Sequence, residues 1–133
     1  MTYLAVAPFS TIGHTVIATS FGSAAVEVMR ITVDRTGYWA AAGAIHVGGG
    51  SGEGGGFNVV LDLRYAGVSQ GTRSFGVNAN SNNYGIGIVI GSPPFLTAGQ
   101  TISIWASKGF SNVHTIDQQF MQAWFLPTQA YLK

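Results

Sequence analysis

Cysteine is absent from the sequence, and charged residues make up only 8% of its 133 positions, where an ordinary soluble domain has about 25%. The absence of cysteine excludes a disulfide framework, a thiol nucleophile and a cysteine-ligated zinc site. Six Lys and Arg residues nearly balance five Asp and Glu residues, for a formal net charge of +1. Such a chain has no strong field to attract nucleic acid or an anionic membrane, so neither partner is predicted.

Signals for export and membrane insertion are also missing. Pro8 interrupts the apolar N-terminal run and no basic segment precedes it, so no secretory signal is predicted. No window approaches the roughly 20 apolar residues of a membrane span. We expect a free-standing single domain that starts at Met1, with residues 1–25 as an N-terminal arm and first strands and residues 26–133 as the core.

Groups that could carry out catalysis are scarce. The acidic residues lie at least seven positions apart, and the three histidines show none of the short spacings of a metal motif. Residues 50–55 match the dinucleotide fingerprint as letters, but a strand-like run follows where that motif needs a helix. Residues 67–71 match the nucleophile elbow, but no acid lies between Ser69 and His114. We therefore predict no catalytic site, no metal site and no cofactor.

Glycine and short apolar runs dominate what is present. Nineteen glycines separate segments in which apolar and polar residues alternate with the period of two that is typical of strands. These segments recur about every ten residues, the spacing of a β-sandwich or jelly roll. The sequence predicts an all-β fold with strands at Val26–Val33, Tyr38–Val47, Phe57–Tyr65, Tyr84–Ile90 and Thr101–Ala106.

Two of these segments also predict which side chains share a face. In the first, alternation puts Val28 with Arg30 on one side and Met29 with Ile31 on the other. In Phe57–Tyr65, alternation puts Phe57, Val59, Leu61, Leu63 and Tyr65 together on one face. The glycine-rich residues 48–56, between two predicted strands, are interpreted as a loop.

Residues 113–126 permit two interpretations. Val113, Ile116, Phe120 and Trp124 are spaced like the apolar stripe of an amphipathic helix. The stretch from residue 120 to 126 can equally form an aromatic strand that ends at Pro127. We favour the strand, because its surroundings are β and aromatic residues suit a sheet.

Aromatic and amide side chains are the remaining candidates for recognition. Aromatic residues within strand patterns are expected to pack in the core or between subunits. A polar run after residue 77 is predicted to be an exposed loop whose residues are adaptable in recognition. The candidates in this loop are Asn78, Asn80, Asn82, Asn83 and Tyr84.

Three passages, in the same order along the chain, resemble one family. Residues 31–39, with Gly37-Tyr38 after a turn, resemble the "apolar strand, turn, Gly-Tyr, strand" passage of the C1q/tumour-necrosis-factor-like (C1q/TNF-like) jelly rolls. Residues 95–104 resemble that family's "Leu-x-Ala-Gly-Asp-x-Val-x-Leu" passage, with Gln100 where the family often has Asp. Residues 120–126 resemble its aromatic closing strand, so the resemblance covers roughly residues 26–126.

The resemblance implies a jelly-roll β-sandwich that forms trimers through an apolar, aromatic face and acts by binding, not by catalysis. The scarcity of charge favours the same assembly, because a trimer buries apolar surface that a monomer would expose. We therefore expect a homotrimer, with an interface that includes Tyr38, Trp105, Phe120 and Trp124.

Free-standing versions of this fold resemble virion components of tailed bacteriophages, which suggests two roles. The first is a trimeric protein that decorates or cements the capsid and binds the major capsid protein or another virion protein. Its N-terminal arm would contact the shell or a neighbouring subunit. The candidate arm contacts are Tyr3, Leu4, Val6, Pro8 and Phe9. The alternative is a receptor- or glycan-binding tail-fibre tip, with Asn78–Tyr84 and Gly109–His114 as loops that contact a host-surface glycan. Either role implies localisation in the virion after synthesis in the host cytoplasm.

Overall fold

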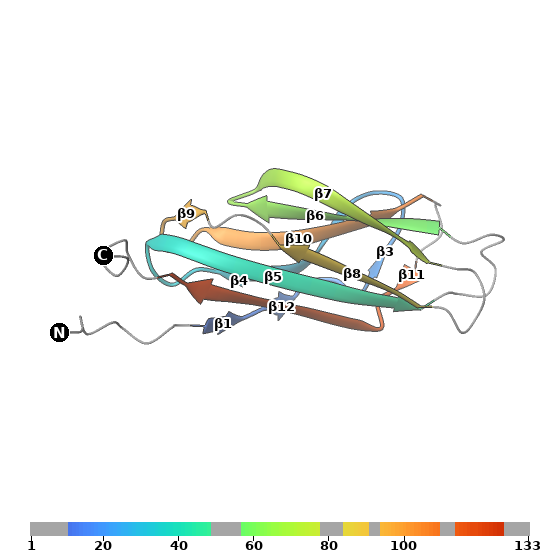
Figure 1. Cartoon of the computed structure of the whole chain (residues 1–133), viewed down its shortest axis with the longest axis horizontal. Coiled ribbons are helices and arrows are strands. Elements are labelled where there is room, and N and C mark those ends of the chain that lie inside the picture. Colours follow the sequence, from blue (N-terminus) through green and yellow to red (C-terminus); the bar gives the residue numbers. More distant parts are fainter. Residues whose placement is uncertain (1–10, 49–56, 78–83, 91–93, 110–113, 127–133) are drawn as a thin grey trace, which may run out of the picture.

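The structure is a computed structural model that describes residues 11–48, 57–77, 84–90, 94–109 and 114–126. Within these residues the chain forms strands and turns and no helix, and the strands run along the long axis of the molecule (Figure 1). The predicted all-β fold is therefore confirmed. The strands are β1 (Thr11–Gly13), β2 (Thr15–Val16), β3 (Ser20–Phe21), β4 (Val26–Thr32), β5 (Gly37–Gly48), β6 (Phe57–Tyr65), β7 (Val68–Val77), β8 (Tyr84–Ile90), β9 (Phe95–Leu96), β10 (Thr101–Lys108), β11 (His114–Thr115) and β12 (Gln118–Phe125).

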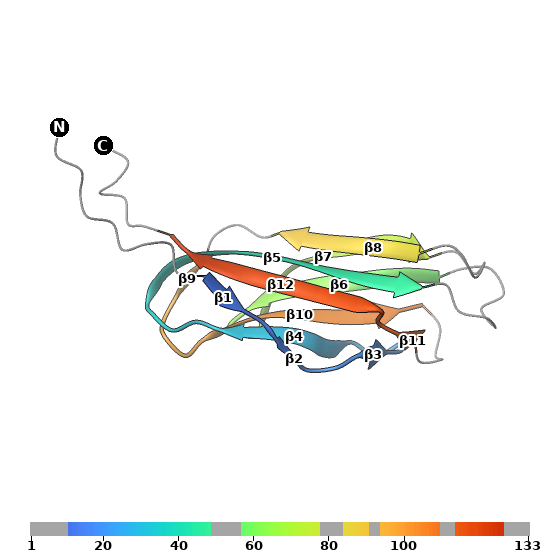
Figure 2. The ribbon, with the colours of Figure 1, turned by 90° about the horizontal axis from the view of Figure 1, so that it is seen from below.

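Two antiparallel sheets form the sandwich. The first has the strand order β1-β12-β5-β8, with β9 also paired to β5, and is called the β5 sheet below. The second has the order β2-β4-β10-β6-β7 and is called the β10 sheet. A short pair, β11-β3, lies at one end (Figure 2). Because sequence neighbours β4 and β5 belong to different sheets, the chain crosses repeatedly between the two layers.

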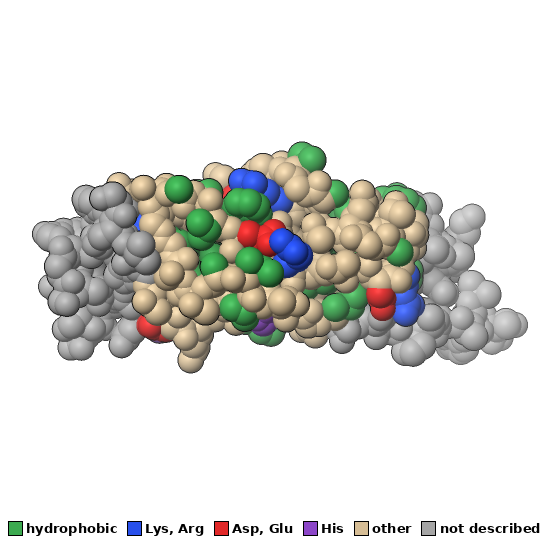
Figure 3. Space-filling model, turned by 180° about the vertical axis from the view of Figure 1, so that it is seen from behind, with side chains coloured by type: hydrophobic (Ala, Val, Ile, Leu, Met, Phe, Trp, Pro, Cys, Tyr) green, Lys and Arg blue, Asp and Glu red, His purple; other side chains and the backbone are tan. Residues whose placement is uncertain are grey.

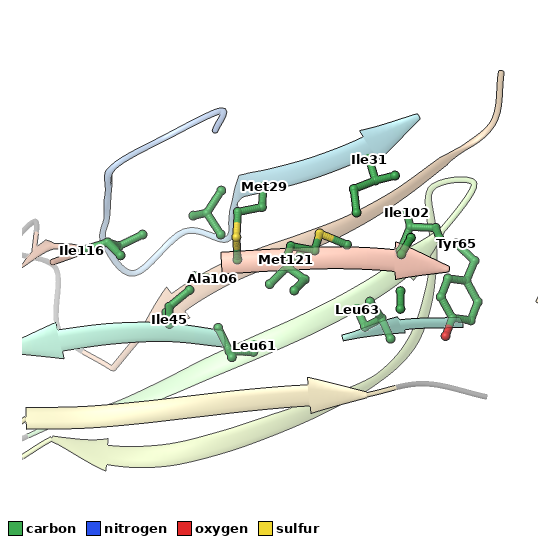
Figure 4. Close-up of a cluster of buried hydrophobic side chains, with 14 of the residues drawn as sticks. Met29, Ile31, Ile45, Leu61, Leu63, Tyr65, Ile102, Ala106, Ile116 and Met121 are labelled. Atoms are coloured by element: carbon green, nitrogen blue, oxygen red, sulfur yellow. The ribbon is translucent and has the colours of Figure 1, made fainter. Parts of the chain in front are cut away.

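The core lies between the sheets and is lined by alternate residues of their strands. Met29 from β4 and Met121 from β12 belong to the same buried cluster, although they come from different sheets (Figure 4). The predicted apolar face of residues 57–65 is confirmed, because Val59, Leu61 and Leu63 are almost fully buried. The largest fully buried side chain is Trp39 of β5.

A β-bulge in β4 corrects one predicted face. β10 pairs Ile104 with Met29 but pairs its next residue, Trp105, with Glu27, so Val28 is an extra residue on β4. The extra residue lets both Val28 and Met29 point into the core, where each is 0% exposed. Simple alternation was therefore wrong to group Val28 with the exposed Arg30.

The predicted strands are all present; β7 and the two-residue strands β9 and β11 were not among those predicted. The strand interpretation of the C-terminal aromatic segment is confirmed by β12, which pairs with β5 along its whole length. β7 was not predicted, because it lies at the edge of the β10 sheet and its residues from Val68 to Ser74 are all exposed. Such a strand lacks the apolar alternation on which the prediction depends.

Gln100 performs a local role in the turn before β10. Its side-chain Oε1 accepts a hydrogen bond from the Thr97 amide at 2.8 Å, and its own amide donates to the Thr97 carbonyl at 2.9 Å. Gly99 between them has φ +95, a conformation that favours glycine. The substitution of Gln for the Asp of the resembled passage therefore keeps an oxygen that closes the turn.

Candidate interaction surfaces

The outward side of the β5 sheet, called the β5 face, carries aromatic and small side chains. The register places Phe120 opposite Ala44, Gln122 opposite Ala42 and Trp124 opposite Ala40. Opposite residues of an antiparallel pair point to the same side, and the residues between them, such as Met121 and Ala123, are buried in the core. The small side chains of Ala40, Ala42 and Ala44 therefore form a shallow strip, called the alanine floor below, beside the larger rings of Phe120 and Trp124.

Two aromatic residues of the β5 face are exposed to solvent, and the third, Trp124, is half-buried. Phe120 is 54% exposed and Tyr38, on the same side of β5, is 48% exposed. Phe95 of β9 is 60% exposed and extends this surface, because its ring meets the Tyr38 ring edge-on at 5.2 Å between centroids. Large apolar side chains exposed together in this way are typical of an interaction surface.

No Lys, Arg, Asp or Glu occurs in the strands that the structure assigns to the β5 sheet. The acidic group that reaches this sheet's end is Asp117, which precedes β12 and whose Oδ2 lies 3.5 Å from Nδ1 of His46. The opposite end of β12 is held by Phe125, whose ring lies edge-on to the buried Trp39 ring and 5.0 Å from the Arg35 guanidinium. Charge therefore meets this sheet only at its ends, within the part of the chain described.

His14 completes the edge of the β5 sheet where the chain leaves it. β1 pairs with β12 only as far as Gly13, and β2 then joins the β10 sheet. The imidazole Nδ1 of His14 lies 3.0 Å from the carbonyl oxygen of Met121 and 3.2 Å from its amide nitrogen. The ring therefore pairs with the β12 backbone just beyond the last paired residue of β1.

The outward side of the β10 sheet, called the β10 face, is different in kind. Trp105 lies at its middle, with Glu27 of β4 and Asp62 of β6 as its paired neighbours on either side. The Arg64 guanidinium covers the indole at 4.0 Å from the ring centroid. Acidic and basic side chains gather side by side in the middle of this face (Figure 3).

The structure brings together three of the four predicted interface residues. Tyr38, Phe120 and Trp124 share the β5 face, whereas Trp105 lies on the opposite side of the sandwich. Sequence analysis missed the alanines of the β5 face and the exposed Phe95; the small residues of the Ala-Ala-Ala-Gly-Ala run at 40–44 were the signal available. The predicted arm contacts Tyr3, Leu4, Val6, Pro8 and Phe9 and the loop residues Asn78, Asn80, Asn82 and Asn83 lie outside the described residues, and Tyr84 begins β8.

The two strings that matched catalytic motifs have ordinary structural surroundings. Ser69 lies in β7, and its hydroxyl donates to Oδ1 of Asp62 at 2.5 Å, so it forms no pair with a histidine. The strand β6 follows the glycine-rich string, which itself lies outside the described residues. Among the residues that are described, no three His, Asp or Glu side chains gather to hold a metal ion, and no helix is long and apolar enough to cross a membrane.

Comparisons with known proteins identify the fold. No protein-family model matches the chain, and no curated protein matches it in sequence. The structure of Eiger TNF from S. frugiperda is similar over 91% of this chain and 94% of that one, with 13% identity and a TM-score of 0.51. A chain in the structure of the infectious bursal disease virus Gx strain is similar over 94% of this chain but only 36% of its own length, with 8% identity and a TM-score of 0.54. The molecule is a jelly-roll β-sandwich of the TNF-like type.

Proposed function

We propose that this chain is a non-enzymatic virion structural protein, which decorates the capsid of a tailed bacteriophage as a homotrimer and binds the major capsid protein. The observation that carries the proposal is the β5 face, which is aromatic, free of Lys, Arg, Asp and Glu in its described strands, and exposed in the single chain. A structural or binding role fits a jelly-roll fold that also occurs in a virus structure. The specific virion role rests on the sequence resemblance described above.

The chemistry of the β5 face supports self-association over binding to a charged partner. Interface centres are depleted of charged residues and enriched in aromatic ones, as this face is. Tyr and Trp residues frequently supply most of the binding energy in such interfaces, and Tyr38 and Trp124 are placed to do so here. The alanine floor between them lets a neighbouring surface approach closely.

Solution mass is the first test of the trimer. Light scattering coupled to size exclusion should give about 42 kDa, three times the 13.9 kDa of one chain. The mass should not fall below that of a trimer as salt is raised, because the proposed trimer interface contains no ion pairs in its described strands. A mass near that of one chain at all concentrations would overturn the trimer.

A pair of variants tests whether the β5 face forms the interface. Ala42→Arg places a charge in the middle of the alanine floor, opposite Gln122, and should convert the trimer to a folded monomer. Ser107→Arg places the same charge on the outward side of β10, in the other sheet, and should leave the trimer intact. If both variants remain trimers, the interface lies elsewhere.

The virion role needs a particle. Purified protein labelled for electron microscopy should bind capsids that lack their decoration protein, at sites that saturate. Removal of residues 1–10 should abolish that binding if they contact the shell. Binding at fibre tips instead of heads would favour the receptor- or glycan-binding role, and no binding to either structure would contradict a virion role.

A further inference from the structure

The β10 face carries an ordered pattern of charge across three strands. One row consists of Arg30 on β4, Ser103 on β10 and Arg64 on β6, which the register places side by side. The next row consists of Glu27, Trp105 and Asp62 on the same three strands. A positive row therefore lies directly beside a negative row, with a serine and a tryptophan at their centres.

Contacts within the chain hold these side chains in place. Arg64 Nε donates to Asp62 Oδ2 at 2.8 Å, and Arg30 forms an ion pair with Glu27. The indole Nε1 of Trp105 donates to the Ser103 hydroxyl at 3.2 Å. The carboxylates are well covered, with 14% and 13% of their side chains exposed, so the charged groups are ordered before any partner arrives.

This arrangement is complementary to itself. Consider a second copy related to the first by a two-fold axis that is parallel to the rows. The axis lies above the sheet, midway between the two rows. The rotation then places the negative row of the second copy over the positive row of the first. Arg30 then faces Glu27 of the second copy, and Arg64 faces Asp62 of the second copy. Ser103 and Trp105 lie at the centre of this contact without charge, since Ser103 is 2% exposed and bonded to the indole, and Arg64 covers the Trp105 ring. An isologous contact needs such self-complementarity.

We propose that the β10 face is a two-fold contact between copies of this chain, formed by exchange of ion pairs between the two rows. The face has no net charge from its four charged residues, so a strongly charged partner gains no advantage on it. The contact uses a different sheet from the proposed trimer interface and does not depend on it. If trimers form, each presents several such faces, and two-fold contacts would link trimers to one another.

Salt sets the strength of this contact. These charged groups already form ion pairs within each chain, so association gives each of them a second partner of opposite charge. Dissolved salt screens the added ion pairs and therefore weakens the association. We expect the apparent dissociation constant from sedimentation to rise at least about tenfold as ionic strength increases from about 0.01 M to 1 M. The measurement is made on the unmodified chain and on the Ala42→Arg variant. The two results distinguish association between trimers from association between monomers.

Two complementary variants give the decisive test. One keeps only the positive row (Glu27→Gln with Asp62→Asn), and the other keeps only the negative row (Arg30→Gln with Arg64→Gln). Each alone should lose the low-salt association, because the remaining charged row of one copy then faces the neutralised row of the other, and both faces carry a net charge of the same sign. An equal mixture should restore it, because the positive row of one variant meets the negative row of the other. A misfolded variant would not be rescued by mixing.

A matched control removes one ion pair elsewhere on the molecule. Asp34→Asn with Arg35→Gln neutralises an ion pair in the turn between β4 and β5, in which Nε of Arg35 lies 3.5 Å from Oδ1 of Asp34. This pair lies away from the β10 face, so its loss should leave association unchanged. The proposal is overturned if the unmodified chain does not associate at low salt, if the mixture fails to associate, or if the control weakens association as much as the row variants do.

Discussion

The two sheets bury similar apolar cores, but their strands differ sharply in charge. Every charged residue in the described strands belongs to the β10 sheet, and the β5 sheet has none. The charged residues of the β10 sheet are Glu27, Arg30, Asp62, Arg64, Arg73 and Lys108. The low charge of the whole chain is therefore not spread evenly over its surface.

This asymmetry makes the two outward faces suited to different surroundings. Ion pairs on the β10 face keep their groups hydrated or paired without help from another molecule. The aromatic and alanine side chains of the β5 face gain stabilisation only when another surface covers them. A chain with few charges, in which every charged residue of the described strands belongs to one sheet, leaves the other sheet suited to an apolar contact.

The largest effect on stability should come from Trp39, and the comparison is with its neighbour Tyr38 on the opposite side of β5. Trp39→Ala removes a side chain that is 0% exposed and should cost about 3–5 kcal/mol of unfolding free energy. Tyr38→Ala, one position earlier and half exposed, should cost less than about 1 kcal/mol in the Ala42→Arg background. Urea denaturation measures both. Equal losses would mean that the β5 face is already buried within the single chain.

The next effect tests how closely the two sheets approach. Gly43 of β5 faces the other sheet, and a Cβ there would overlap Cδ1 of Ile104 and lie 3.2 Å from the Phe120 carbonyl oxygen. Gly43→Ala should therefore destabilise the fold by about 2 kcal/mol, because an added methyl group overpacks the core. Urea denaturation should show a lower midpoint with an unchanged slope.

Gly76→Ala is the matched control on the β10 sheet. Its Cβ would meet only Asn58 Oδ1 at 3.6 Å, an ordinary contact distance. The change should alter the free energy of unfolding by less than about 0.5 kcal/mol, because the strand edge has room for it. A loss equal to that of Gly43→Ala would show that the effect reflects glycine in a strand and not the spacing between sheets.

A smaller effect should come from the hydrogen bonds that join the sheets. Gln119 of β12 donates its side-chain amide to the carbonyl of Val28, the bulge residue of β4, at 2.8 Å and to that of Ala18 at 3.1 Å. Gln119→Leu should cost about 1 kcal/mol, because both carbonyls lose a donor. Gln118→Leu, exposed beside it, should change stability by less than half as much. Thermal unfolding that ranks them in the reverse order would contradict this role.

Sequence alternation predicted the parts of this fold whose residues have one buried side. β6 was predicted with its bounds and its buried face, because a strand with one buried side has apolar residues at alternate positions. β7 was missed because it is almost entirely exposed and nothing constrains its pattern. The bulge at Val28 was missed because two adjacent apolar residues do not reveal which of them is the inserted one.

The surfaces were less predictable than the fold, since they depend on pairing between distant strands. Phe120 and Trp124 share a face with Tyr38 only because β12 pairs with β5, a relation that no local pattern contains. Trp105 looked equivalent in sequence but lies in the other sheet, where Arg64 covers it. The charge rows of the β10 face likewise appear only when β4, β10 and β6 are placed side by side.

The smallest effect should come from a phenol buried in the β10 sheet, that of Tyr65, whereas Tyr38 on the β5 face is half exposed. Tyr65 is 7% exposed, and its hydroxyl has no hydrogen-bond partner among the described residues. Tyr65→Phe should therefore leave stability at neutral pH unchanged or raise it by up to about 1 kcal/mol. Burial raises the pKa of the Tyr65 phenol above its ordinary value of 10.0. The folded chain thus keeps its proton at a pH where the unfolded chain loses it, so stability is present below pH 10.0 and is lost as pH rises further. In urea denaturation from about pH 8 to about pH 11, Tyr65→Phe should lose less stability than the unmodified chain. Parallel curves for the two proteins would show that the Tyr65 phenol ionises with equal ease in the folded and unfolded states.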